Sequence, residues 1–198
     1  DIEFALIDDA ADADFNGTPD FDNTKPIVFN TAQAAFLVGY AAASYSKSGI
    51  VATWGGMNFP TVTIFMDGFA QGVAYYNSEN GTAVQVLGYD PASPDTATFT
   101  GGFEANDVAK STAQNFIDQG ADILLPVGGP IYQSAVAAIT DSGKDIALIG
   151  VDADLFETDP STQDIIFTSI LKGIKSATSA VVADAAAGNF SNEAYVGT

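Results

Sequence analysis

The residues best suited to chemistry are an acid and a base, Asp152 and Lys172, twenty positions apart in a chain with few cations. Asp152 follows the apolar run LIGV, and Lys172 closes the segment TSILK. A carboxylate accepts hydrogen bonds and an ammonium donates them, so together they match a pair of neighbouring hydroxyl groups on a ligand. A closed site also requires that each charge neutralise the other. The structural alternative is that Asp152 caps the following turn and Lys172 is solvated.

Two glycine pairs follow strand-like segments, in GGMNFP from Gly55 and in LLPVGG at Gly128 and Gly129. Glycine lets the backbone approach a ligand closely, although most glycine pairs are simply turn residues. Neither pair belongs to a GxGxxG or Walker sequence, so dinucleotide or ATP binding is disfavoured.

The segment Gly55–Phe59 adds Gly56, Met57 and Phe59 to the candidate ligand-binding residues. Phe59 either touches the ligand or staples the entry to the following helix. Asp8 and Asp9 form a further pair of acids, either a paired-carboxylate site or part of a solvated loop, because six aspartates lie in residues 8–23.

Composition removes several classes of function. The net charge is −19 and all six basic residues are lysines. So acidic a chain repels phosphate backbones and anionic lipids, which argues against nucleic-acid binding and against a basic membrane patch. Without arginine an anionic ligand is disfavoured, and a neutral one fits better. Without histidine or cysteine the usual nucleophilic triads, zinc sites and disulfides are excluded, and we expect no cofactor.

The elements alternate between strands and helices, which predicts an α/β fold with parallel sheets. Apolar spacing predicts a helix over 32–46, with Phe36, Leu37 and Tyr40 facing the core, and a second helix with Val62, Phe65, Phe69 and Val73 buried. A third helix is predicted over 107–118. Ligands bind beyond the carboxyl ends of parallel strands, and the candidate residues above all follow strand patterns. The chain begins with the strand pattern FALI and no signal-peptide pattern, as if earlier elements had been cut away.

The segments SGIVATWGGMNFPTVTIFMDGFAQGVAYYN, GADILLPVGG, IGVDAD and FTSILK resemble the basic membrane protein family over nearly the whole chain. That resemblance implies a substrate-binding lipoprotein of an ABC importer, similar to the purine nucleoside receptors. The implied fold is two-lobed and periplasmic-binding-protein-like (type I), lacking the amino-terminal part of the first lobe. Residues 1–52 would belong to the first lobe and 53–168 to the second, and 169–198 would return to the first.

The resemblance also implies residue roles and partners. Asp152 and Lys172 would bind ribose hydroxyls, and Gly56 with Gly128 or Gly129 would let the backbone approach a nucleoside clamped between the lobes. Members with purine stacking carry an aromatic residue where this chain has Leu125 and Pro126. The implied partner is an ABC permease, the implied location is extracytoplasmic, and the lipid anchor would lie outside this sequence.

Three hypotheses follow. The first is a non-enzymatic subunit that captures a nucleoside and delivers it to the permease. The second is a nucleoside hydrolase that uses Asp8, Asp9, Asp152 and Asp154 with calcium, although these acids lack the tight clustering of such a centre. The third is a sugar-binding sensor of related fold.

Overall fold

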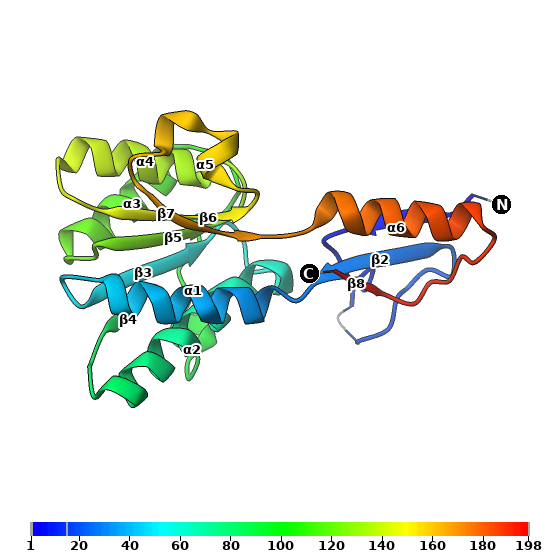
Figure 1. Ribbon diagram of the computed structural model, residues 1–198, viewed down its shortest axis with the longest axis horizontal. Helices are drawn as coiled ribbons and strands as arrows, with labels where there is room; N and C mark the ends of the chain where they lie inside the picture. The colour runs from blue at the N-terminus through cyan, green and yellow to red at the C-terminus, as the bar shows by residue number, and fades with distance from the viewer. Residues whose placement is uncertain (1, 15, 198) are drawn as a thin grey trace. The chain divides into compact units, whose positions relative to one another are not determined.

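The computed structural model describes residues 2–14 and 16–197. The chain forms two compact units, which are described one at a time (Figure 1). The large unit is Thr31–Leu171. The small unit combines the residues up to Asn30 with those from Lys172 onward. Each unit is built around a parallel β-sheet, as the alternating sequence pattern predicts.

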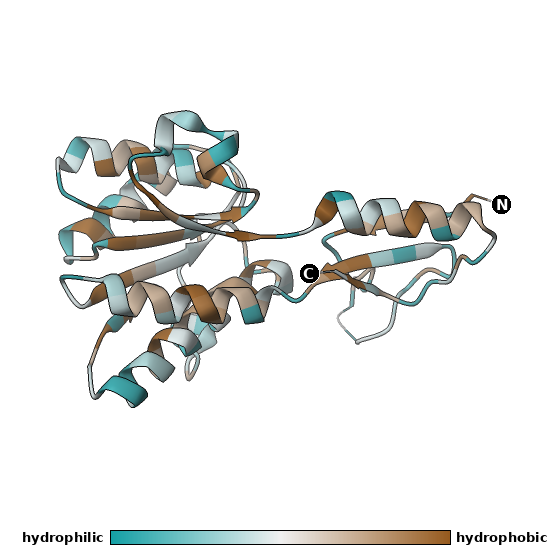
Figure 2. Ribbon diagram, viewed as in Figure 1, coloured by the Kyte–Doolittle hydropathy of each residue, from teal (hydrophilic) through white to brown (hydrophobic). Residues whose placement is uncertain are grey.

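The sheet of the large unit has five strands in the order β4-β3-β5-β6-β7. Neighbouring strands are parallel throughout. Strands β5 and β6 appear in Figure 2 as largely apolar segments, as expected for strands that are buried on both faces. The strand bounds are β3 Ile50–Gly55, β4 Gln85–Leu87, β5 Ile123–Val127, β6 Ala147–Asp152 and β7 Ile166–Leu171.

Helices cover both faces of this sheet (Figure 1). Because side chains alternate along a strand, Val51 packs with α1 and α2 while its neighbour Ala52 packs with α3 and α4. The main helices are α1 Thr31–Tyr45, α2 Pro60–Asn80, α3 Asp107–Asp118 and α4 Ile131–Ser142. The short ones are α5 Leu155–Thr158 and the 3-10 turns Pro94–Thr96 and Pro160–Thr162.

Helices α1 and α2 pack closely through glycine. A Cβ atom on Gly39 would overlap the carbonyl of Phe69, and one on Gly72 would overlap the carbonyl of Phe36. The buried face of α1 therefore carries small residues such as Ala35 and Gly39. The sequence predicted that Leu37 would face the core together with Phe36 and Tyr40. That prediction is wrong for Leu37, which is 69% exposed. Close helix contact selects small side chains, and hydrophobicity alone does not reveal that choice.

The small unit is a three-stranded parallel sheet in the order β1-β2-β8. Helix α6 packs on it through Ala177 and Val181, which meet Ile27 and Phe29 of β2. All four residues of the edge strand β1 are exposed, including Phe4 and Leu6. The bounds are β1 Phe4–Ile7, β2 Thr24–Phe29, α6 Ile174–Ala186 and β8 Tyr195–Gly197.

The compact units divide between Asn30 and Thr31 and again between Leu171 and Lys172. The tight packing of α1 on α2 places the whole of α1, together with strand β3, in the large unit. The lobe boundaries that the resemblance implies, at residues 52 and 168, stay a prediction.

Other helix expectations are confirmed. Val62, Phe65, Phe69 and Val73 are all buried in α2, and α3 has the expected bounds of Asp107–Asp118.

Among the described residues, no helix combines the length and apolar character needed to cross a membrane.

Candidate functional site

The order of strands in the large unit reverses between β3 and β5. From β3 the chain goes to β4 on one side, then crosses to β5 on the other and continues outward through β6 and β7. Two loops therefore diverge at the carboxyl ends of β3 and β5, which is the usual place for a ligand in open parallel sheets. The glycine pairs predicted from the sequence follow these two strands.

Gly56 and Gly128 are neighbours across this switch point. The N–H of Gly56 donates to the carbonyl of Val127 at 3.0 Å. Gly128 has φ of +135°, a conformation open essentially only to glycine. Gly129 follows with φ of +42°, and a Cβ atom there would meet open space. The sequence thus identified two backbone segments that the fold does bring together.

The space that these glycines leave is filled by a side chain that sequence reasoning missed, Phe103. A Cβ atom on Gly56 would lie 2.7 Å from Phe103 Cε1, and one on Gly128 would lie 2.5 Å from Phe103 Cδ1. Phe103 belongs to the segment GGFEAN in the long connection before α3. Its only sequence signal was an aromatic residue beside another glycine pair, which does not say where the loop folds.

Met57 and Phe59 lie in the turn between β3 and α2, and both remain accessible. They are 38% and 41% exposed. The Phe59 carbonyl accepts hydrogen bonds from the N–H groups of Val62 and Thr63, both at 2.9 Å, so its backbone begins α2. Its ring lies 6.2 Å from that of Phe103, with 30° between the ring planes. The side chain therefore faces another aromatic group at the switch point.

Asp152 is the last residue of β6 and has φ of +68°. Left-handed backbone is uncommon for a residue with a side chain, and such residues cluster at functional sites. Asp154, two residues later, accepts a hydrogen bond from the N–H of Phe156 at 3.1 Å and caps α5. The two acids of this segment are therefore different: Asp154 stabilises a turn, and Asp152 holds an unusual backbone geometry at a strand end.

Within the small unit, Lys172 forms an ion pair with Asp8. The distance from Lys172 Nζ to Asp8 Oδ2 is 2.7 Å, and the lysine side chain is only 3% exposed. Asp8 also has a left-handed backbone, with φ of +63°. Its neighbour Asp9 instead accepts a hydrogen bond from the N–H of Ala11 at 2.8 Å and closes a local turn. Asp8 thus pairs with a buried lysine while its own side chain stays 32% exposed, whereas Asp9 is a loop residue.

The same loop contains a group of three acids. Among the residues that the structure describes, one oxygen each from Asp12, Asp14 and Asp20 lies within 4.8 Å of the others. The order Asp-x-Asp-x-Asn-Gly over 12–17 is also found in calcium-binding loops. These carboxylates accept hydrogen bonds from backbone N–H groups of the loop, for example that of Asn16 to Asp12 Oδ1 at 3.0 Å. Because this bonding accounts for their proximity, we assign them no metal.

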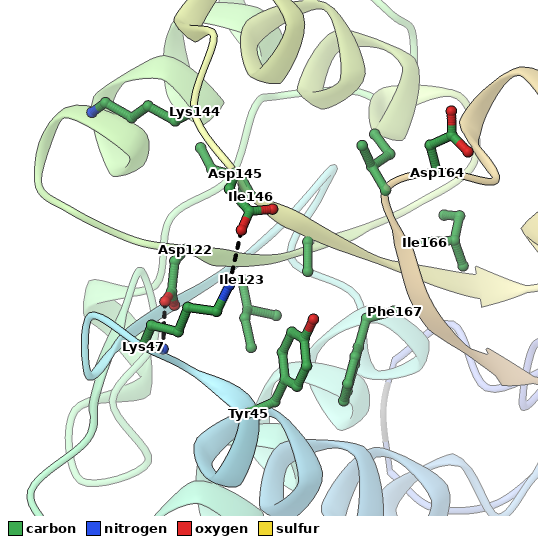
Figure 3. A pocket seen from close by; sticks show the side chains of 12 residues that line it. Tyr45, Lys47, Asp122, Ile123, Lys144, Asp145, Ile146, Asp164, Ile166 and Phe167 are labelled. Carbon is green, nitrogen blue, oxygen red and sulfur yellow. Dashed lines mark hydrogen bonds and ion pairs between the residues drawn. The ribbon is translucent and has the colours of Figure 1, made fainter.

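A hollow of about 340 Å³ lies at the opposite, amino edge of the large unit's sheet (Figure 3). Tyr45 and Phe167 form one wall, with ring centroids 4.9 Å apart. Lys47 reaches Asp145 at 2.9 Å, and both side chains are largely exposed. The hydrogen bond and charge of Lys47 lower the pKa of Asp145, and the same contacts raise the pKa of Lys47. Such an exposed ion pair is solvated, and it is more typical of a protein surface than of a ligand-binding site.

Comparison with known proteins agrees with this architecture. The model of a family described as ABC transporter substrate-binding protein PnrA-like matches residues 1–196. The chain belongs to this family.

The similar proteins are consistent with the family. Basic membrane protein D of Borreliella burgdorferi (strain JD1) is 31% identical over 132 residues, which are 67% of this chain and 35% of that protein. Basic membrane protein A1 of Borrelia garinii subsp. bavariensis is 26% identical over 174 residues, 88% of this chain and 46% of that protein. The chain thus spans less than half the length of these curated relatives.

Solved structures show the same fold. The solute-binding protein of an ABC transporter system from Aeropyrum pernix K1 superposes with a TM-score of 0.78 at 26% identity. The match covers 98% of this chain and 50% of that one. Both the family and the parallel α/β fold are those that the sequence motifs predicted.

Proposed function

We propose that the protein is the extracytoplasmic ligand-binding subunit of an ABC importer and that its ligand is a nucleoside, which it delivers unchanged to the permease. In the proposal a lipid anchor, outside the present sequence, holds the whole protein at the membrane. Membership of the substrate-binding family supports the transport role. The nature of the ligand has to be argued from the side chains.

The observation that carries the nucleoside assignment is the ion pair between the buried Lys172 and the partly exposed Asp8. A lysine with 3% exposure needs a carboxylate nearby, because an isolated buried ammonium would lose its proton or destabilise the fold. The ammonium and a carboxylate also match the donors and acceptors of neighbouring ribose hydroxyls. In our proposal Lys172 donates to a ribose hydroxyl and Asp8 holds Lys172. Asp152, in the large unit, is proposed separately as an acceptor for a ligand hydroxyl.

The remaining candidates suit the rest of a nucleoside. Gly56, Met57, Phe59, Gly128 and Gly129 all lie in the loops that follow β3 and β5, at the switch point of the sheet. This surface offers backbone groups and aromatic faces and is not dominated by charge, which suits a neutral heterocycle. The net charge of −19 further favours a neutral ligand over an anionic one.

A thermal-shift screen tests the proposal, using the protein in its full natural length with nucleosides, free bases, sugars and amino acids. A nucleoside at about 100 times its Kd should stabilise the folded protein by about 2.7 kcal/mol. Lys172→Met should abolish the shift, and the matched control Lys175→Met, at an exposed lysine of α6, should leave it unchanged. No shift with any nucleoside would refute the proposal, and a shift with sugars alone would favour a sugar-binding sensor.

The hydrolase alternative predicts a different outcome. It requires Asp8, Asp9, Asp152 and Asp154 in one calcium centre, yet Asp9 and Asp154 each close a local turn. Chromatography after incubation with calcium should therefore return the nucleoside intact. Release of free base would contradict the transport proposal.

A further inference from the structure

The turn that follows β6 is held at both ends by the neighbouring strand β7. Asp152, the last residue of β6, lies opposite Leu171 in the pairing of the two strands. Three residues later the N–H of Leu155 donates a hydrogen bond to the side-chain Oγ of Ser169 in β7, at 3.1 Å. The chain therefore leaves β7 at Asp152 and is bound to it again at Leu155.

Gly150 leaves the space in which the Ser169 hydroxyl lies. The two residues are opposite each other in the pairing of β6 with β7. A Cβ atom on Gly150 would lie 2.5 Å from Ser169 Oγ and 2.8 Å from Leu155 Cγ. Leu155 is itself buried, with 6% of its surface exposed. The hydroxyl, the leucine side chain and the bare glycine backbone thus form one packed cluster beside the turn.

Asp152 has its left-handed backbone, with φ of +68°, between these two points of attachment. The N–H of Ala153 donates to the carbonyl of Val151 at 2.8 Å, which tightens the chain around Asp152. Left-handed backbone is unfavourable for a residue with a Cβ atom, so it persists where surrounding contacts hold it. The bond from Leu155 to Ser169 is such a contact, because it fixes where the chain must go after the turn.

The local cap of α5 does not replace this bond. Asp154 accepts a hydrogen bond from the N–H of Phe156, and both residues belong to the same turn. That bond shapes the start of α5 without tying it to the sheet. The tie from the backbone of this turn to a side chain of the sheet is the bond to Ser169.

We propose that Ser169 is a positioning residue for ligand binding: its hydroxyl holds the turn in the conformation that presents the Asp152 carboxylate to a ligand hydroxyl. Ser169 itself does not touch the ligand. This inference rests on the proposed nucleoside-binding function and on Asp152 as an acceptor. An acceptor contributes most when its position is fixed before the ligand arrives, because ordering it during binding subtracts from the affinity.

Calorimetric titration of the full-length protein with inosine and uridine tests this inference. Ser169→Ala removes the acceptor of the Leu155 N–H. It should weaken each nucleoside that the wild type binds by about 3- to 10-fold, the loss expected for one neutral hydrogen bond. Ser169→Thr keeps a hydroxyl and suits a strand, so it should bind like the wild type. Equal losses in the alanine and threonine variants would overturn the role of the hydroxyl.

A double variant separates positioning from a merely structural role. Asp152→Gly removes the carboxylate, and glycine adopts the left-handed backbone without steric cost. In that background Ser169→Ala has no carboxylate to misplace, so it should change nucleoside affinity by less than about twofold. The same loss with and without Asp152 would overturn the inference and leave the proposed function standing.

The matched control is Ser46→Ala. Ser46 is half-buried like Ser169, and its Oγ accepts a hydrogen bond from the N–H of Gly49 at 3.0 Å in the connection from α1 to β3. The control should lower the Tm, as Ser169→Ala does, and leave nucleoside affinity unchanged. A loss of affinity as large as that of Ser169→Ala would mean that general destabilisation explains both variants, and it would overturn the inference.

A further variant covers the case in which Ser169→Ala does not fold. Ser169→Cys keeps a side chain of similar shape, but sulfur is a weak acceptor. It should lose affinity while its circular dichroism spectrum stays that of the wild type. Wild-type protein that binds a nucleoside while Ser169→Cys keeps full affinity would overturn the role of Ser169 alone. Wild-type protein that binds neither inosine nor uridine would overturn the proposed function first.

Discussion

The strands of the large unit's sheet begin at one edge and end at the other, and the chain builds these two edges from different residues. At the carboxyl edge the chain uses glycines, aromatic rings and a left-handed aspartate, namely Gly56, Gly128, Phe103 and Asp152. At the amino edge it uses exposed charges such as Lys47 and Asp145 around an open hollow (Figure 3). The hollow is the more obvious cavity, yet the costly backbone geometry lies at the other edge. We therefore place the candidate site by backbone strain and close approach, and not by cavity size.

The largest expected effect comes from adding one methyl group at the carboxyl edge. Gly128→Ala combines an unfavourable φ of +135° with a Cβ atom 2.5 Å from Phe103, so it should lower the unfolding free energy. The expected loss is roughly 2 to 5 kcal/mol. Gly129→Ala, with φ of +42° and open space around the Cβ atom, should lose only about 1 kcal/mol. Urea denaturation of both variants makes the comparison.

The contact with Phe103 can be separated from backbone strain by a double variant. Phe103→Ala removes the ring that the new methyl group meets, so Gly128→Ala should be less damaging in that background than in the wild type. Strictly additive losses would show that Gly128 is needed only for its conformation and that the ring does not rest on it.

A second prediction separates the two acids after β6. Asp152→Asn should weaken nucleoside binding by about 10- to 150-fold, because it removes a charged acceptor worth about 1.5–3 kcal/mol. Its stability should change little, since asparagine also tolerates left-handed backbone. Asp154→Ala should do the reverse: it removes the cap of α5, at a cost of about 0.5–1 kcal/mol, and leaves affinity unchanged. Calorimetric titration and thermal unfolding of both variants test this, and equal affinity losses would contradict it.

The smallest effect is expected at the amino edge. Asp145→Asn should shift the Tm by no more than about a degree and should not alter ligand affinity, because the pair with Lys47 is solvent-exposed. Since Lys47 lowers the pKa of Asp145, the contribution of this acid is present above its unfolded pKa of about 3.9 and disappears as pH falls through the lower folded value.

Melting curves between about pH 2 and 7 check this sign. The wild type and Asp145→Asn should converge at the acid end and in high salt, where the pair is screened. A loss of ligand affinity in this variant would mean that the two edges are coupled and that the contrast between them is incomplete.

Much of the candidate site was predictable because strand direction follows from chain order. Once helices alternate with strands, the segments after IVATW, ILLPV and LIGV must reach the same edge of a parallel sheet. That rule puts Gly56 and Gly128 at the same edge, and the pairing of β3 with β5 then makes them neighbours. The buried face of α2 was predictable for a similar local reason, since Val62, Phe65 and Phe69 repeat at helical spacing.

Other features depended on contacts between distant segments. The small-residue face of α1 reflects its packing on α2, so Leu37 is exposed where its hydrophobicity predicted burial. The same packing places all of α1 in the large unit, so the chain passes from one compact unit to the other between Asn30 and Thr31. The partner of Lys172 was also hidden, because Asp8 is 164 positions away and stands in a loop with many other aspartates.

By itself, the sequence determined the parallel α/β architecture, the edge of the large unit's sheet at which Gly56, Gly128 and Asp152 lie, and the exclusion of histidine, cysteine and arginine chemistry. These conclusions rest on periodicity, chain direction and composition, which are properties of the chain alone. Only the tertiary structure decided that Phe103 rests on Gly56 and Gly128 and that Lys172 pairs with Asp8. Both contacts join a loop to a segment far away in the chain, and which loop folds onto which strand end is set by long-range packing that no local pattern encodes.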